Sequence, residues 1–553
     1  MPFLISLTIL QDTPVSSPKV STSSSPREET EDAAGEDDSD SARFPHLDFD
    51  FLQPNRIRDA EGRLASDPDY CPRTLYVPEG FMKKQTPGHR QWWAAKSAYF
   101  DTVLFFKVGK FYEMYHMDAV IGVENLNLNY MRGGFAHCGF PEVAYGRFAD
   151  QLVNRGFKVA RVEQTETPSQ LESRNKAEKA NDKVVRREVC NIATSGTRTY
   201  GVLDGNDQQG IIELMDSTAR YLYAIAERGS DRMEYGVCFV DTTVGRFYIG
   251  RFSDSGSRSA LRTLFAHHQP AQILYERGRV SASTMAVYNN ALSAVAKEAL
   301  IPKKEFLTAE NTLKLLANEK YFGGTYEKWP VVLLKMIDRS SLVPKCDSAY
   351  EASMSALGAV IWYLKRCLVD VDMISMRQFE LYKPVDLTGP LPEEKEEPKT
   401  GEALWRGRRL VLDGLTLKHL NIVPPVGGIN KFVARDPVTA KYALFNVINK
   451  CITPADAIQW VTEAGSKKFI QRATECLRKV PDLERLVQKI HTFGLKYRAE
   501  EHPDSRAQMF ETMRYNKRKI RDLVQALEGF ERVLELRSEF MRNFGSISRS
   551  ACI

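Results

Sequence analysis

The sequence predicts a multidomain α/β plus α fold, with two α/β parts followed by an α-helical part. Two observations carry this prediction. Strand-like and helix-like patterns alternate between residues 89 and 345, which is typical of mixed α/β domains. After residue 345 the apolar positions recur at spacings of three and four, which indicates amphipathic helices. The length of 553 residues is enough for roughly three or four domains.

The first 88 residues are predicted to lie outside the compact domains. Residues 1–43 are expected to be a disordered acidic tail, because Ser, Thr, Pro and acidic residues bury too little apolar surface to offset the ordering entropy. Eight acidic residues and no basic one lie between Glu28 and Asp40. Residues 44–88 read as an extended, partly docked lead-in. The whole chain carries +5, so the part outside the acidic run carries +13. Such a charge indicates a polyanionic partner, and a charge that serves solubility alone is the alternative of equal weight.

Composition and missing motifs exclude several classes of protein. No apolar run is long enough for a membrane span, so no membrane partner is expected. The nine cysteines are scattered without a Cys-x-x-Cys pair, which argues against a disulfide framework and a zinc site and for a reducing, intracellular location. The phosphate-binding G-x-x-x-x-G-K-[ST] loop, G-x-S-x-G and H-E-x-x-H are absent. No catalytic residue and no metal ligand is therefore predicted.

The first α/β domain is expected over residues 89–205. A helix-like stretch covers residues 90–100, and an apolar strand over 103–108 ends at Gly109. A second helix is predicted over 147–155 and a second strand over 157–162. The alternation of strands and helices predicts a mixed α/β domain.

The second α/β domain is expected over residues 206–345. Strands are predicted over 221–226, 235–241, 246–252 and 271–275, with a helix over 257–268. This strand, hairpin, helix and strand order is compatible with an RNase H-like layer. Residues 346–553 are expected to be helical, with an exposed loop over 384–401. Two apolar stripes, both expected to be helix-packing core, are Met354, Leu357, Ile361, Leu364 and Leu368, and Ile520, Leu523, Leu527, Phe530 and Leu534.

The segment with the most distinctive chemistry follows the strand over 103–108. Phe111 and Glu113 lie two residues apart after a glycine turn, beside Lys107 and Lys110. A loop-borne aromatic can stack on a base, lysines can neutralise phosphates, and a carboxylate near DNA needs a specific task such as accepting a hydrogen bond from a base. The alternative is ordinary core aromatics with solvated charges. A second Phe-x-Glu, at residues 140–142, has no lysine within three positions, so the first copy is preferred.

Three arginines are further candidates for phosphate contacts: Arg132, Arg186 and Arg187. A nuclease is the remaining alternative, given the RNase H-like order. Two-metal chemistry needs several converging carboxylates. The sequence offers Asp241 at a strand end and Glu276 after a later strand.

Extended runs of the sequence resemble the MutS family of DNA mismatch repair proteins. They are KVGKFYEMY at 107–115, GFPE at 139–142, VARVEQTETP at 159–168, VVRRE at 184–188, YGVCFVDT at 235–242, PDLERL at 481–486 and HPDSR at 502–506. The resemblance covers about residues 45 to 535. It implies a mismatch-binding domain at 89–205, an RNase H-like connector domain at 206–345, and a partial helical core and lever domain at 346–553. The sequence departs from the family's pattern between about 455 and 480.

The resemblance also implies a function. Phe111 would wedge beside a mispaired base of duplex DNA and Glu113 would hydrogen-bond that base. The chain would be the mismatch-recognition subunit of a MutSα-type heterodimer with MutS homologue two, located in the nucleus. ATP and Mg²⁺ are expected only in the family's C-terminal ATPase domain, which this sequence lacks, so no catalysis is expected in this chain. The alternative is a non-catalytic scaffold that binds DNA weakly.

Overall fold

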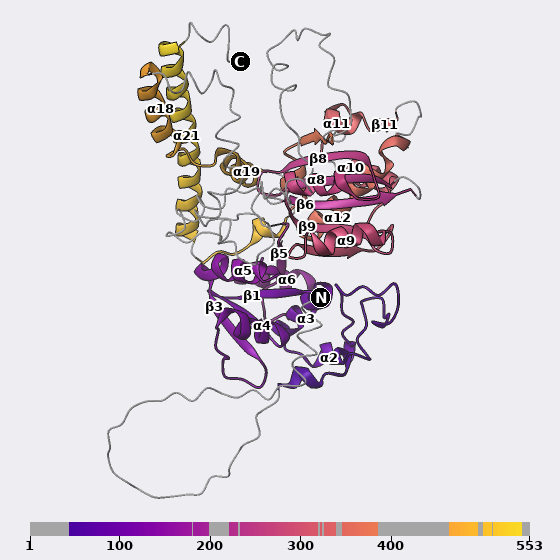
Figure 1. The fold of residues 1–553 in the computed structure, drawn as a ribbon. Helices are drawn as coiled ribbons and strands as arrows, with labels where there is room; N and C mark the ends of the chain where they lie inside the picture. Colours follow the sequence, from indigo (N-terminus) through magenta and orange to yellow (C-terminus); the bar gives the residue numbers. More distant parts are fainter. Residues whose placement is uncertain are drawn as a thin grey trace, which may run out of the picture. The chain divides into compact units, whose positions relative to one another are not determined.

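The computed structural model describes residues 44–179, 181–197, 221–229, 233–318, 321–322, 326–338, 345–384, 464–495, 502–510 and 512–544. The expected acidic tail, the boundary near 205, nearly all of the 384–401 loop and the first part of the departure at 455–480 lie outside these residues. The chain divides into two compact units, residues 1–144 with 148–189, and residues 145–147 with 190–553 (Figure 1). Each unit is described by itself.

The first unit is built on a five-stranded sheet in the order β3-β2-β1-β4-β5. Its strands are β1 (Thr102–Val108), β2 (Phe111–Tyr115), β3 (His137–Pro141), β4 (Lys158–Gln164) and β5 (Arg187–Ala193). Its helices are α2 (Glu79–Lys84), α3 (Pro87–Ala98), α4 (Met117–Leu126), α5 (Tyr145–Asn154) and α6 (Pro168–Glu178). Strand β1 pairs antiparallel with β2 and parallel with β4, as a mixed α/β domain requires. The predicted strands and helices of this region are confirmed.

The lead-in docks onto this unit through aromatic side chains. The short 3-10 helices η1 (Pro45–Asp48) and η2 (Asp50–Leu52) flank Phe49. Phe51 and Phe81 lie 5.5 and 5.3 Å from the ring of Trp93, both edge to face. Such pairs stabilise beyond their buried area, so the lead-in is an integral part of the first unit.

The second unit contains a six-stranded sheet in the order β10-β9-β6-β7-β8-β13. Its strands are β6 (Tyr221–Arg228), β7 (Met233–Asp241), β8 (Arg246–Asp254), β9 (Pro270–Glu276), β10 (Ala296–Leu300) and β13 (Gln378–Leu381). Strands β6, β7 and β8 form an antiparallel meander, and β9 runs parallel to β6. This arrangement agrees with the expected RNase H-like layer. The helices around it are α8 (Ser259–His267), α9 (Ala282–Asn290), α10 (Ala309–Asn318), α11 (Val331–Leu334), α12 (Glu351–Arg366) and α13 (Asp370–Ile374).

The structure corrects the expected boundary at residue 345. Helices α8 and α9 cover one face of the sheet, where Tyr223 and Val237 belong to a buried cluster with Leu261 and Val287. Helix α12 packs against β6 and β7, and β13 adds an edge strand after it. The sheet domain therefore continues to residue 381. The apolar stripe of α12 is buried as predicted. The spacing of apolar residues predicts a buried helix face, but it does not show that a sheet covers this face.

The close packing of α12 on β7 depends on Gly236. A Cβ at this position would lie 2.1 Å from the carbonyl carbon of Ala352 and 2.3 Å from the amide nitrogen of Ser353. Because both atoms are backbone, we expect Gly236→Ala to push α12 off the sheet and to lower the free energy of unfolding by about 3 kcal/mol. Gly256→Ala is the matched control, since nothing lies within 4 Å of its Cβ. Urea unfolding of both variants measures the effect, and equal midpoints would contradict this packing.

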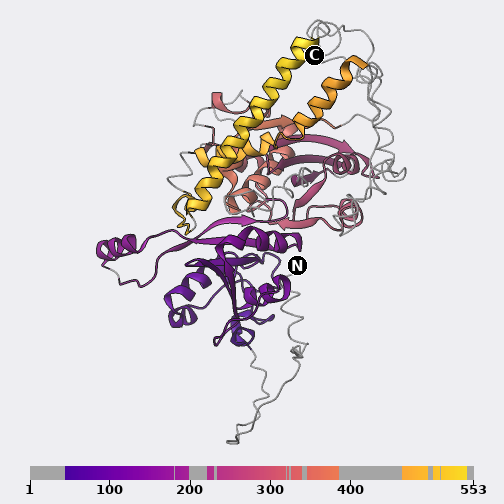
Figure 2. The same ribbon diagram turned by 90° about the vertical axis from the view of Figure 1, so that its left-hand side faces the viewer.

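Three helices form the described C-terminal part: α18 (Ala464–Leu477), α19 (Leu483–Gly494) and α21 (Thr512–Phe544). Helix α19 is capped by Asp482, whose carboxylate accepts a hydrogen bond from the Arg485 amide at 3.1 Å. Helix α21, the long yellow helix of Figures 1 and 2, is linked to α19 by the ion pair of Lys489 and Asp522 at 2.7 Å. None of the described helices has the length and apolarity that crossing a membrane requires.

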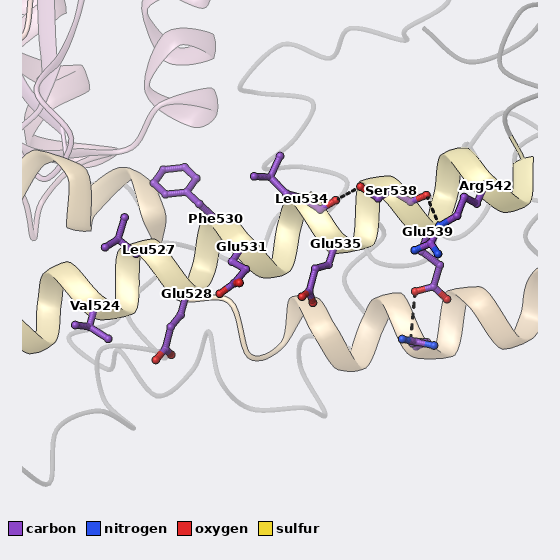
Figure 3. Close-up of a pocket in the computed structure, with 11 residues that line it drawn as sticks. Val524, Leu527, Glu528, Phe530, Glu531, Leu534, Glu535, Ser538, Glu539 and Arg542 are labelled. Carbon is purple, nitrogen blue, oxygen red and sulfur yellow. Dashed lines mark hydrogen bonds and ion pairs between the residues drawn. The ribbon is translucent and has the colours of Figure 1, made fainter.

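The apolar stripe of α21 is not the buried core that its spacing suggested. Ile520, Leu527 and Leu534 are 63%, 60% and 58% exposed. Part of the stripe lines a groove of about 830 Å³ with Arg472 of α18 and the acidic side chains of α21 (Figure 3). The period of the pattern correctly predicts the helix, whereas burial depends on which other segments cover it.

Candidate nucleic-acid interface

Phe111 is presented by a tight hairpin at the edge of the first unit. Strands β1 and β2 are joined by a two-residue turn in which Gly109 has φ +57°, a conformation that favours glycine. Residues alternate along β2, so Tyr112 and Met114 are buried while Phe111 is 44% exposed. The alternative reading as core aromatics is correct for Tyr112 and wrong for Phe111.

Glu113 lies on the same face of β2 as Phe111 and is held by two side chains. Its Oε2 accepts hydrogen bonds from the Tyr115 hydroxyl at 2.5 Å and from His137 Nε2 at 3.0 Å. Burial raises the pKa of this carboxyl, but the hydrogen bonds from His137 and Tyr115 and the charge of Arg187 outweigh burial and place the pKa below its usual value. Glu113 is therefore an anion at neutral pH and only accepts hydrogen bonds.

The structure corrects the prediction that Lys107 contacts DNA phosphates. The Lys107 side chain is fully buried. Its ammonium lies 3.0 Å from Glu142, 3.7 Å from Glu163 and 4.4 Å from the centre of the Tyr112 ring. Strand β1 is the central strand of its sheet and is buried on both faces, so Lys107 lies in the interior, where only paired charges are tolerated. Lys107 is a structural residue.

The second Phe-x-Glu, at residues 140–142, supplies a carboxylate that pairs with the buried Lys107. Phe140 is buried and packs 4.9 Å from Phe105, edge to face, while Glu142 is the ion-pair partner of Lys107. The preference for the first copy as a contact surface agrees with this placement. No lysine lies near Glu142 in the sequence, but the fold brings Lys107 of β1 next to it.

The four other predicted basic residues differ in their surroundings. Lys110 is exposed in the β1–β2 turn beside Phe111, and Arg132 is exposed in the segment between α4 and β3. Arg186 is exposed and lies 3.6 Å from Glu178. Among the described residues, neither Arg132 nor Arg186 contacts Phe111 or Glu113.

Arg187 is half-buried, and its guanidinium is engaged within the fold. Its Nε donates to the Lys107 carbonyl at 2.7 Å, and the guanidinium lies 5.2 Å from the Phe106 ring. Burial lowers the pKa of Arg187, against the opposing influence of Tyr115 and Glu113. The charge of Arg187 acts on Glu113, and its phosphate contact stays a prediction.

Two residues that hold Glu113 are absent from the sequence-based prediction. Tyr115 could have been found, because residues two apart on a strand share a face. His137 could not, because its position depends on the pairing of β2 with β3, which places it opposite Tyr115. Gly139, opposite Glu113, belongs to the same arrangement, since a Cβ there would lie 2.9 Å from the Tyr112 carbonyl oxygen and 3.3 Å from Glu113 Cγ.

The strand pairing argues against the nuclease alternative. Asp241 pairs with Tyr221, at the start of β6, and its carboxylate accepts hydrogen bonds from the Thr243 amide and hydroxyl. Glu276 ends β9, near the opposite end of β6, and pairs with Arg228 at 2.9 Å. At roughly 3.3 Å per residue the two carboxylates cannot share metal ions. No cluster of three metal-ligating side chains occurs within the described ranges.

The two α/β units match two domains of a family whose named members are DNA mismatch repair proteins. Residues 86–202 match the family model of MutS domain I, and residues 220–372 match that of MutS domain II, which includes α12. The chain belongs to the MutS family. It is 40% identical over 530 residues to the DNA mismatch repair protein Msh6 of Gallus gallus and 40% identical over 536 residues to that of Homo sapiens, each covering 90% of this chain and 38% of the relative. The probable Msh6 of Drosophila melanogaster is 38% identical over 517 residues, 90% of this chain and 42% of the relative. The chain thus spans about two fifths of the length of these relatives.

Proposed function

We propose that this chain recognises mismatched duplex DNA, with Phe111 as a wedge beside the mispaired base and Glu113 as the acceptor of a hydrogen bond from that base. The observation that carries the proposal is the placement of an exposed aromatic ring and a held carboxylate on one face of one strand. A mispaired step unstacks and kinks at lower free energy than a paired one. Discrimination then comes from the deformability of the DNA.

The wider assignments are part of the same proposal. Lys110, Arg132 and Arg186 are exposed and suited to phosphate contacts. The chain is proposed to act in the nucleus as one half of a heterodimer with MutS homologue two. Its own domains bind DNA without catalysis, and ATP with Mg²⁺ belongs to the family's ATPase domain. The named relatives and the two matched domains support the role in mismatch repair, whereas the statements on ATP and Mg²⁺ rest on the family resemblance alone.

Phe111→Ala is expected to reduce the preference of the chain for a G·T duplex over the matched G·C duplex by about tenfold. Stacking of an aromatic ring on a base contributes roughly 1–3 kcal/mol to binding. Phe111 gains this contribution only at the mispaired base step, which opens to admit the ring. Fluorescence anisotropy titrations of both duplexes at one fixed salt concentration give the ratio of dissociation constants.

Lys110→Ala is the control for this experiment. It is expected to weaken both duplexes alike and to flatten the salt dependence of binding, because it removes a phosphate contact and leaves the wedge in place. An unchanged ratio in Phe111→Ala would reject the wedge. A chain that binds neither duplex would favour the scaffold alternative.

A further inference from the structure

His137 lies on β3 and reaches across to β2. Its Nε2 is 3.0 Å from Glu113 Oε2, and its ring stacks on Tyr115 with centroids 4.9 Å apart. The Tyr115 hydroxyl donates to the same Oε2 at 2.5 Å. Both donors therefore converge on one carboxylate oxygen. The other, Oε1, forms no hydrogen bond with any described residue, while 17% of the Glu113 side chain remains exposed.

We propose that His137 is a positioning residue that holds Glu113, together with Tyr115, by Oε2, so that Oε1 faces a hydrogen-bond donor on the mispaired base. This inference rests on the proposed function of Glu113 as the base contact. A free glutamate side chain has several rotamers, and fixing it on binding costs conformational entropy. The two donors remove that cost in advance, which is preorganisation of the contact.

The surroundings of Glu113 also define what it can recognise. Four groups face it: Tyr115 on its own strand, His137 on β3, Arg187 on β5 and His89 on α3. His137, Tyr115 and Arg187 favour the anion, against the burial that disfavours it. A carboxylate anion has no proton to donate. As an anion, Glu113 would accept a hydrogen bond from an imino or amino N–H of the base.

Two substitutions at His137 separate positioning from packing. His137→Phe keeps a ring that can stack on Tyr115 and removes the donor. His137→Gln removes the ring and keeps an N–H donor of similar reach. We expect His137→Phe to reduce the G·T over G·C preference about fivefold, and His137→Gln to retain it within about twofold. A packing role would give the reverse order of the two variants and would overturn the proposal.

A double-mutant cycle with Glu113→Ala tests whether His137 acts through Glu113. His137→Phe is expected to have no further effect on the preference when Glu113 is already Ala. An equal reduction in both backgrounds would overturn the inference. If Glu113→Ala itself leaves the preference unchanged, the proposed function of Glu113 fails. If Glu113→Ala lowers the preference and neither His137 variant does, only the present inference fails.

The pH dependence of the G·T over G·C preference is a further test, because it would not change if His137 served only in packing. His137 is one of the groups that lower the pKa of Glu113 against burial, so without this donor the pKa rises and the anion is lost at a higher pH than in the parent chain. Between pH 8 and pH 5 we expect the preference of His137→Phe to fall as the pH is lowered, with a midpoint above that of the parent chain. Superimposable profiles would overturn the inference. The measurements use the complete 553-residue chain and the two duplexes named above.

Discussion

Lys107→Ala is expected to lower the free energy of unfolding of the first unit by about 3–5 kcal/mol. The substitution removes the cation that faces two buried carboxylates. Glu163 retains Arg161 at 3.1 Å, whereas Lys107 is the only cation in contact with Glu142 among the described residues. An uncompensated buried charge is among the few changes that destabilise a domain this strongly. Hydrogen exchange of the β1 and β2 amides measures the loss in the first unit alone.

Lys110→Ala is the matched control, three residues along the same hairpin. Its side chain is exposed, so its removal is expected to change the free energy of unfolding by less than about 0.5 kcal/mol. The pair of variants separates stability from DNA contact. Loss of affinity for both duplexes in Lys107→Ala, with unchanged amide protection, would show that this lysine contacts DNA.

Acidification is expected to destabilise the first unit because two histidines are buried there as neutral rings. Burial lowers the pKa of His46 to about 4 and that of His116 to about 3. The two rings lie 5.8 Å apart, and the His116 ring lies 5.1 Å from Trp93. In the described part of the chain neither ring nitrogen of either residue has a hydrogen-bond partner. The unfolded chain takes up a proton on each near pH 6.5, while the folded unit does so only near its lowered pKa.

The histidine contribution to stability is thus fully present above pH 6.5 and is lost as the pH falls toward 4. At pH 5 the two residues together lower the free energy of unfolding by roughly 4 kcal/mol, since one pKa unit corresponds to about 1.4 kcal/mol. Hydrogen exchange of β1 amides, corrected for the intrinsic rate at each pH, gives the slope. His46→Phe should reduce the slope by about half, and the exposed His267→Phe should leave it unchanged. Identical slopes in all three proteins would show that the buried histidines do not cause the loss.

Much of the fold follows from local patterns. The strand over 103–108 and the helix over 90–100 were predicted from apolar runs and periods, which act between near neighbours. The structure begins that helix at Pro87. Phe111 and Glu113 were singled out by their spacing after a glycine turn, and their roles as wedge and base contact came from the resemblance to the MutS family. The structure places both residues on strand β2 and not in a loop. The assignment of α12 to the six-stranded sheet domain and the exposure of the α21 stripe could not be predicted, because both depend on segments distant in the sequence.

The two lysines of the hairpin show where local reasoning ends. By itself, the sequence determined that an aromatic ring and a carboxylate stand two residues apart after a glycine turn, because the conformational freedom of glycine is a local property. Only the tertiary structure decided which lysine is exposed and what holds the carboxylate. Glu142, Glu163 and His137 are brought to the hairpin by pairing and packing across the sheet, and the charge of a side chain acts according to its neighbours in space.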